Sequence, residues 1–146
     1  MYSSDDQVYV DGGWDYRLDE EVAKYPDKIY CVWFNDGWEA ENFCTFPIVS
    51  SQWIETLGYF MFPFFEHFFI DSWIWLLAKS LDRAIYIPEI LVEHRHWKIG
   101  KSEKDDTYER NATSLGDDRH ARDRAIIDKF ERYFYADVEL LKSLMR

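Results

Sequence analysis

Two carboxylates near the start of the chain and two imidazoles far downstream are the side chains best suited to chemistry. Asp5 and Asp6 are adjacent. His94 and His96 stand on either side of Arg95. Alternate side chains of a strand point to the same face, so both imidazoles would face one side there. Carboxylate and imidazole groups are ligands of divalent metal ions. The spacing therefore predicts a metal site if the fold brings the two regions together.

A third candidate, Asp71, comes just before an apolar run that begins at Trp73. The helix dipole stabilises a carboxylate at a helix N-terminus as the anion, and the anion can accept a proton as a general base. The ordinary role of an aspartate in this place, or of Ser72, is to cap the helix. An Asp-Asp pair in a polar terminus is likewise ordinarily solvated surface. Each signal by itself leaves both interpretations open.

The elements expected to position these residues include a short helix and the strands of a small sheet. A short helix is expected from Asp15, its N-cap, to Tyr25, because a proline follows. The run from Lys28 to Asn35 is rich in β-branched and aromatic residues, which predicts a strand. Asn35-Asp36-Gly37 is expected to form a turn. Glu39 to Val49 predicts a second strand, joined to the first by a hairpin or a wider loop. Two more short strands are expected from Ala84 to Ile87 and from Ile90 to Glu93.

Two helices are expected between the strands. Ser50 or Ser51 caps a helix that begins at Gln52 and ends at Leu57, where Gly58 closes it. A strongly apolar helix runs from Trp73 to Leu81. Between these helices lies a loop of bulky aromatic residues.

The last third of the chain divides into a polar segment and an amphipathic helix. Residues 98–118 are polar, which predicts a mobile loop. Residues 119–146 form the helix, whose apolar side chains recur every three or four residues at Ile126, Phe130, Phe134, Val138, Leu141 and Met145. The whole chain, residues 1–146, is expected to be one domain of the α/β or α+β class. A small mixed sheet would be flanked by helices and closed by the C-terminal helix.

Composition narrows the function classes. The formal net charge is −11, which argues against a nucleic-acid partner, because affinity for phosphates comes from Lys and Arg. Cys31 and Cys44 fit buried free thiols, and the polar, acidic start predicts no signal peptide. We therefore expect a cytoplasmic protein, free or at a membrane surface. The run from Leu57 to Ala78 has about the length of a membrane span. A proline and three polar or charged residues interrupt it, so no transmembrane segment is expected.

Several short motifs follow one another in a fixed order. They are Ser4-Asp5-Asp6, Gly13-Trp14-Asp15, Phe46-Pro47-Ile48-Val49-Ser50, Leu57-Gly58-Tyr59-Phe60, Asp71, Tyr86-Ile87-Pro88 and Val92-Glu93-His94. As an ordered series, residues 3–97 resemble the C-terminal half of family 2-type glycosyltransferases with the A-type nucleotide-sugar-binding fold. Members of that family transfer a sugar from a nucleotide donor to a hydroxyl acceptor. The family motif often has a third acidic residue where Gln7 stands here.

The resemblance implies roles for the candidate residues. Asp5 and Asp6 fall on the acidic motif that binds a divalent metal, Mn²⁺ or Mg²⁺, with Asp6 as the direct contact. His94, with His96 as a second candidate, falls on a late histidine that helps to hold this metal. Asp71 falls on the position of the catalytic base.

The resemblance also implies an acceptor side. Trp14, Gly58 and Tyr59 fall on turns that shape the acceptor site, and Trp73 belongs to an aromatic series that suits stacking on sugars. Most of those aromatic residues are equally expected in the core. The partners implied are a nucleotide-sugar and a carbohydrate acceptor.

Two rival functions remain open beside the transferase. The chain would be a non-catalytic remnant that binds carbohydrate or protein, or a metal-dependent hydrolase built from the same residues. The family carries its nucleotide-binding half before the acidic motif, which opens the chain here. We therefore expect a truncated or split enzyme. It would form a homo-oligomer or bind a partner chain that covers the exposed sheet edge.

Overall fold

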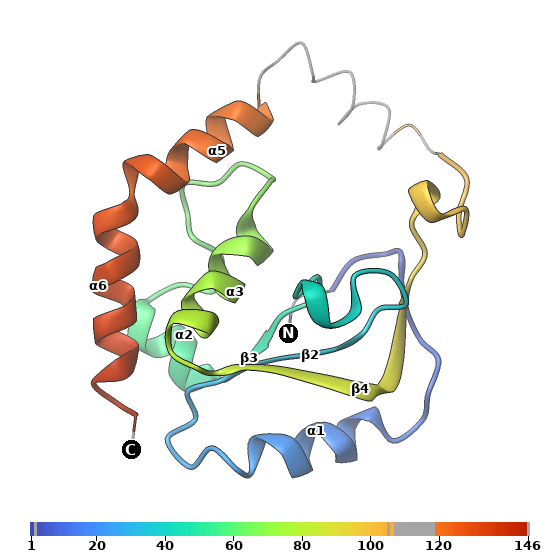
Figure 1. The fold of residues 1–146 in the computed structure, drawn as a ribbon, viewed down its shortest axis with the longest axis horizontal. Coiled ribbons are helices and arrows are strands. Elements are labelled where there is room, and N and C mark those ends of the chain that lie inside the picture. The colour runs from blue at the N-terminus through green and yellow to red at the C-terminus, as the bar shows by residue number, and fades with distance from the viewer. Residues whose placement is uncertain (2, 105, 107–118, 146) are drawn as a thin grey trace.

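A mixed sheet of four strands with helices on both faces forms the centre of the computed structural model, which describes residues 1, 3–104, 106 and 119–145 (Figure 1). The strands are β1 (Gln7–Tyr9), β2 (Cys31–Asn35), β3 (Ile48–Val49) and β4 (Ala84–His94). Their order in the sheet is β1-β4-β2-β3. β4 is parallel to β2, whereas the two outer pairs are antiparallel. The expected mixed sheet flanked by helices is confirmed.

The helices divide between the two faces of the sheet. They are α1 (Trp14–Val22), α2 (Ser51–Leu57), α3 (Ile70–Ser80), α5 (Arg119–Lys129) and α6 (Glu131–Lys142), with 3₁₀ turns η1 (Ala40–Asn42) and η2 (Trp97–Ile99). α1 covers one face, and α2, α3 and α6 lie on the other (Figure 1). No helix in the described part of the chain is both long and apolar enough to cross a membrane.

β2 is buried on both faces because its side chains alternate between two cores. Cys31 and Trp33 pack with the helices α2, α3 and α6, whereas Val32 and Phe34 pack over α1. The connection through α2 and α3 is long enough for β4 to return parallel to β2. This arrangement places the ends of β2 and β4 side by side.

Two expected strands form one. β4 continues past Pro88, and the pairing with β2 shifts register there, from Phe34 opposite Ile87 to Asn35 opposite Leu91. A proline has no N–H to donate to a neighbouring strand, so a bulge accommodates it without ending the strand.

The strand expected from Glu39 to Val49 is wrong over most of its length. Only Ile48–Val49 pairs with β2, and η1 occupies Ala40–Asn42. The carboxylate of Asp36 accepts the backbone N–H groups of Trp38 and Ala40, at 3.0 and 2.8 Å. These bonds fold the segment into a turn, because an aspartate that binds nearby backbone groups competes with strand pairing.

The helix from Ser50 to Gly58 is confirmed. The Ser50 hydroxyl accepts the N–H of Trp53 at 2.9 Å, and Gly58 ends the helix with φ of 76°. The N-caps predicted for α1 and α3 are wrong. Gly13 and Phe69, both with positive φ, are the N-cap residues of these helices. Asp15 and Asp71 are each the second residue of their helix and lie in its first turn.

The apolar face of the C-terminal segment is confirmed, but the segment is not one helix. All six predicted side chains pack against the core beneath α2 and α3. The chain bends at Phe130, whose ring stacks on Phe64 at 4.4 Å and meets Phe62 at 5.5 Å. Met145 lies just beyond the end of α6. The polar loop predicted over 98–118 lies mostly outside the described residues.

Candidate functional site

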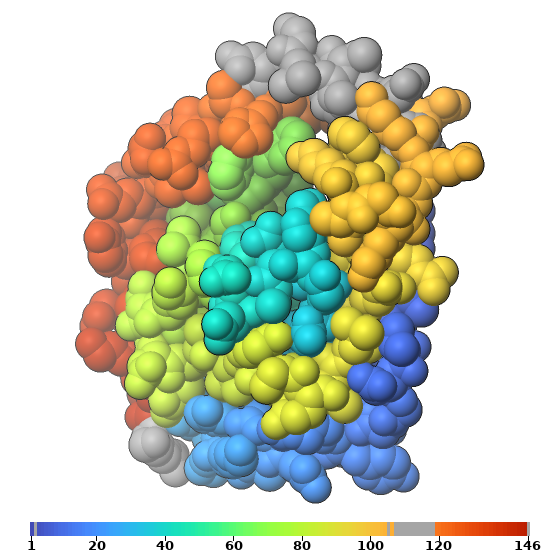
Figure 2. Space-filling model, turned by 45° about the vertical axis from the view of Figure 1, so that its right-hand side comes forward, coloured from blue at the N-terminus to red at the C-terminus, as the bar shows by residue number. Residues whose placement is uncertain are grey.

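One pocket of about 310 Å³ is lined by four of the nine candidate residues: Asp6, Asp71, His94 and His96. Its lining comes from the N-terminus, the end of the η1 loop, the segment that leads into α3 and the end of β4: Ser4, Asp6, Thr45, Phe46, His67, Phe68, Phe69, Ile70, Asp71, His94 and His96. Figure 2 shows the η1 loop (cyan), the residues after β4 (gold) and the segment before α3 (green) on one face. Two surface hollows of about 450 Å³ around Pro26 and Lys28 contain none of the predicted residues.

Strand pairing brings Asp6 to His94. β1 runs antiparallel to β4 with Gln7 opposite His94, so the preceding residue lies beside the end of β4. The Asp6 Oδ2 and His94 Nε2 atoms are 3.1 Å apart. The Asp6 carbonyl accepts the N–H of Arg95 at 2.7 Å, and its carboxylate accepts the hydroxyl proton of Ser4. The backbone and the side chain of Asp6 therefore each accept a hydrogen bond, and together these bonds hold the carboxylate beside the end of β4.

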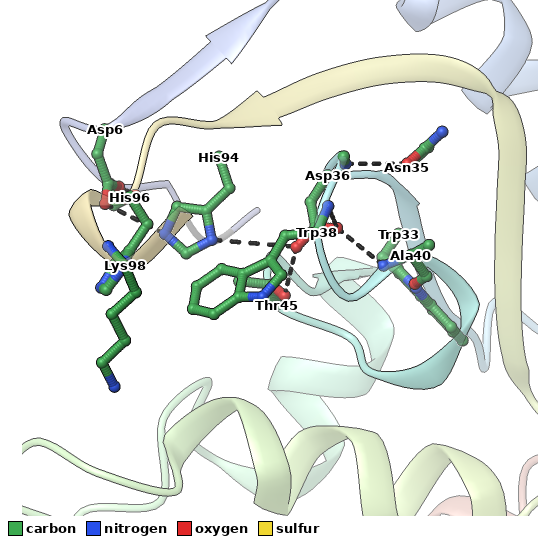
Figure 3. A network of polar contacts seen from close by, with 12 residues as sticks. Asp6, Trp33, Asn35, Asp36, Trp38, Ala40, Thr45, His94, His96 and Lys98 are labelled. Carbon is green, nitrogen blue, oxygen red and sulfur yellow. Dashed lines mark hydrogen bonds and ion pairs between the residues drawn. The ribbon is translucent and has the colours of Figure 1, made fainter. Parts of the chain in front are cut away.

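The other nitrogen of His94 faces Asp36, a residue that sequence reasoning treated only as part of a turn. Asp36 is 2% exposed. Its Oδ2 accepts the Thr45 hydroxyl at 2.9 Å and lies 4.0 Å from His94 Nδ1 (Figure 3). That nitrogen is buried and makes no hydrogen bond within the described residues. Each ring nitrogen therefore faces a carboxylate, and Asp6, at 3.1 Å, is the nearer one. A metal ion held by Asp6 and Nε2 would leave the ring proton on Nδ1, toward Asp36.

His96 lies at the edge of the pocket. Its Nδ1 accepts the backbone N–H of Lys98 at 3.2 Å, and its ring centre lies 4.9 Å from that of Trp38. Burial lowers the pKa of His96, and the neighbouring His94 and Lys98 lower it further. The neutral imidazole, the form that binds metals, is favoured there.

Asp71 enters the pocket from the first turn of α3. Its Oδ1 accepts the N–H of Ser72 at 2.7 Å. Burial raises the pKa of Asp71, and the hydrogen bonds from Ser72 and the nearby His67 oppose this only in part. A carboxylate with a raised pKa is a better proton acceptor than an ordinary one.

The separation of Asp6 and His94, which is that of a hydrogen bond, is also compatible with one divalent ion between them. Ligands about 2.1 Å from Mg²⁺ at adjacent corners of an octahedron lie about 3.0 Å apart, close to the 3.1 Å between Oδ2 and Nε2. No group of three metal-binding side chains is found among residues 1, 3–104, 106 and 119–145. Mg²⁺ commonly takes one or two protein ligands together with phosphate oxygens, so two ligands suffice for an ion that also binds a diphosphate.

The other predicted site residues lie elsewhere. Asp5 is exposed and does not line the pocket. Trp14 packs on Tyr9, with ring centres 4.7 Å apart. Gly58 caps α2. Trp73 is 1% exposed and donates its Nε1–H to the hydroxyl of Tyr59 at 3.2 Å, so its indole has no free face for a sugar. The structure does not bring these five residues into the pocket.

Three aromatic side chains make up much of the pocket wall, and two of them belong to the series from Trp53 to Trp75 that the sequence offered for stacking on sugars, although none was singled out. They are Phe46, Phe68 and Phe69. The ring of Phe46 also meets that of His94, with centres 5.0 Å apart. The aromatic loop before α3 was the available signal, but its periodicity does not tell which rings face the pocket and which enter the core.

No family model matches the sequence, no curated protein matches it, and no solved structure matches the fold. Functional inference therefore depends on the chemistry of the pocket and on the order of its motifs.

Proposed function

We propose that the pocket is the metal and acceptor site of a glycosyltransferase that moves a sugar from a nucleotide donor to a hydroxyl group. One observation supports this most strongly. Asp6, Asp71, His94 and His96 come from three segments that are distant in the sequence, and all four line one pocket. Unrelated surface aspartates and histidines would have no reason to converge there.

The chemistry of the pocket suits this reaction. Asp6 and His94 would hold the divalent metal, with His96 beside them. A metal bound there supplies positive charge that neutralises the diphosphate leaving group. Asp71 would accept the proton of the acceptor hydroxyl while the oxygen of that hydroxyl bonds to the sugar carbon and the nucleoside diphosphate leaves. The aromatic side chains Phe68 and Phe69 offer apolar surface to a sugar ring.

Thermal unfolding with Mn²⁺ and inorganic pyrophosphate tests the metal site without requiring a nucleotide-base pocket. At ligand about 100-fold above its dissociation constant, binding stabilises the protein by about 2.7 kcal/mol. That corresponds to roughly 5–10 °C in Tm for a chain of this size. Asp6→Ala should abolish the shift. Asp5→Ala removes the same charge from an exposed neighbour outside the pocket and should keep it.

Transfer itself is tested by mass spectrometry with a panel of nucleotide-sugars and simple glycoside acceptors. Asp71→Asn should keep the pyrophosphate shift and lose transfer. No shift in the unmodified protein at millimolar Mn²⁺ and pyrophosphate would overturn the proposal. Sugar binding without that shift would instead identify a carbohydrate-binding remnant, and phosphoester hydrolysis without an acceptor would identify a hydrolase.

A further inference from the structure

A buried carboxylate on α5 binds the segment that forms one wall of the pocket. Asp123 is 0% exposed. Its Oδ1 accepts the backbone N–H of Glu66 at 2.9 Å, and its Oδ2 accepts those of His67 and Phe68 at 2.9 and 2.8 Å. Burial raises the pKa of Asp123, but the three N–H groups outweigh it and hold the pKa below its ordinary value. The carboxylate is therefore ionised at neutral pH, when its hydrogen bonds are strongest.

Other α5 side chains contact the same segment. The His120 ring meets those of Phe68 and Phe69, with centres 5.2 and 4.9 Å apart. Arg122 donates to the carboxylate of Glu66 at 3.1 Å. In Figure 1, α5 lies beside the chain that leads into α3. The contacts combine a buried anion, ring packing and an exposed ion pair.

The segment needs such support because its backbone is unfavourable. Phe69 has φ of 64°, in the left-handed region that a bulky side chain rarely adopts. Conformations of this kind persist only when surrounding contacts enforce them. The strained residue stands between the three N–H groups bound by Asp123 and the helix that carries Asp71. Five consecutive residues, 67–71, line the pocket.

We infer that Asp123 is a positioning residue, which fixes residues 66–68 and thereby the pocket wall and the place of Asp71. The effect on the reaction rests on the proposed function, but the effect on the wall does not. α5 thus has a second role besides covering the core: it sets the shape of the acceptor side from outside the pocket.

Amide hydrogen exchange measured by NMR tests the effect on the wall. In Asp123→Asn, one oxygen becomes an NH₂ group that cannot accept, so at least one N–H loses its partner. Protection of the Glu66, His67 and Phe68 amides should fall about tenfold or more. Amides in the middle of α3, such as that of Leu77, should change much less. Asp128→Asn, an exposed position on the same helix, is the matched control and should change neither set.

Kinetics and ligand binding separate positioning from general stability. Asp123→Asn should keep the Mn²⁺ and pyrophosphate shift, because the hydrogen bonds of Asp123 go to residues 66–68 and not to Asp6 or His94. Transfer should fall at least about tenfold through a higher KM for the acceptor or a lower kcat, at temperatures well below Tm. If the unmodified protein shows no pyrophosphate shift, the proposed function fails while the exchange experiment still decides the role of Asp123.

Equal loss of protection at residues 66–68 and at Leu77 would overturn the inference, since Asp123 would then stabilise only the whole fold. Unchanged protection would overturn it as well. If Asp123→Asn does not fold, His120→Ala decides, because it removes ring contacts without leaving a buried charge. In His120→Ala, amide exchange should increase at residues 66–68 alone. A uniform increase over the chain, or no change at all, would overturn the inference.

Discussion

Replacing Asp36 should separate its role in the η1 turn from its role beside His94. In Asp36→Asn, the remaining oxygen can keep both backbone N–H bonds made by Oδ1. The new NH₂ can donate to the Thr45 hydroxyl, which rotates to accept. We therefore expect the free energy of unfolding to stay within about 1 kcal/mol of the original value. The negative charge facing His94 Nδ1 at 4.0 Å is lost.

The loss of that charge should weaken metal binding. Carboxylates that accept the N–H of a metal-binding histidine are worth about 10–100-fold in affinity. Asp36 lies at 4.0 Å without that hydrogen bond, so we expect the lower end, about tenfold or roughly 1.4 kcal/mol. Asp36→Ala should additionally lose all three hydrogen bonds. We expect about 2–4 kcal/mol of lost stability, a fall in Tm on the order of 10 °C.

The assay is isothermal titration with Mn²⁺ in the presence of pyrophosphate, together with thermal unfolding without ligand. Asp5→Asn makes the same charge change at an exposed site and should leave both measurements unaltered. The reasoning about charge is refuted if Asp36→Asn binds Mn²⁺ as tightly as the unmodified protein. The reasoning about the turn is refuted if Asp36→Ala unfolds at the original temperature.

Three further predictions concern the packing of α6 on the core. Tyr59→Phe should cost about 1–3 kcal/mol by urea unfolding, because Asp137 and the Trp73 indole N–H each lose a buried partner; a change under 0.5 kcal/mol would contradict this. Leu141→Ala, at a site 0% exposed, should lower the free energy of unfolding by about 2–5 kcal/mol. Leu140→Ala, at a site 49% exposed, should lower it by less than about 1 kcal/mol. Equal losses would contradict the orientation of α6, in which Leu141 faces the core and Leu140 does not. Burial raises the pKa of Asp137 despite the Tyr59 hydrogen bond, so its contribution to stability is complete below the ordinary aspartate pKa and declines as pH rises through the raised value. Asp137→Asn should remove that decline from the Tm measured between pH 3 and 7. If Tm changes with pH in the same way in the variant and in the unmodified protein, Asp137 is not the cause of the decline.

Local features of the fold were predictable from the sequence because they depend on neighbours in the chain. The Ser50 cap and the Gly58 closure each need only a hydrogen bond or a φ value within one helix. β2 follows from its β-branched and aromatic composition, and the apolar face of the C-terminal segment follows from periodicity. The same local rules failed at Asp15 and Asp71, since a glycine and a strained phenylalanine precede them and begin the helices instead.

The candidate site was predictable in its residue types but not in its supports. The order of the motifs indicated Asp6, Asp71 and His94 without showing what holds them. Asp36 looked like an ordinary turn residue, and Asp123 looked like any charged residue of an amphipathic helix. Their side chains are anchored by groups that sequence patterns do not connect to them, such as the His67 amide.

The sequence by itself determined most of the helices, the two central strands, the apolar face of the C-terminal segment and the side chains that have the chemistry for a metal and a base. Only the tertiary structure decided which of these meet. Asp6 and His94 are 88 positions apart, and Asp123 binds amides up to 57 positions away. Such contacts form because strand pairing and helix packing bring the segments together, and buried carboxylates must then find donors. That requirement, rather than any local pattern, selects the partners of each carboxylate.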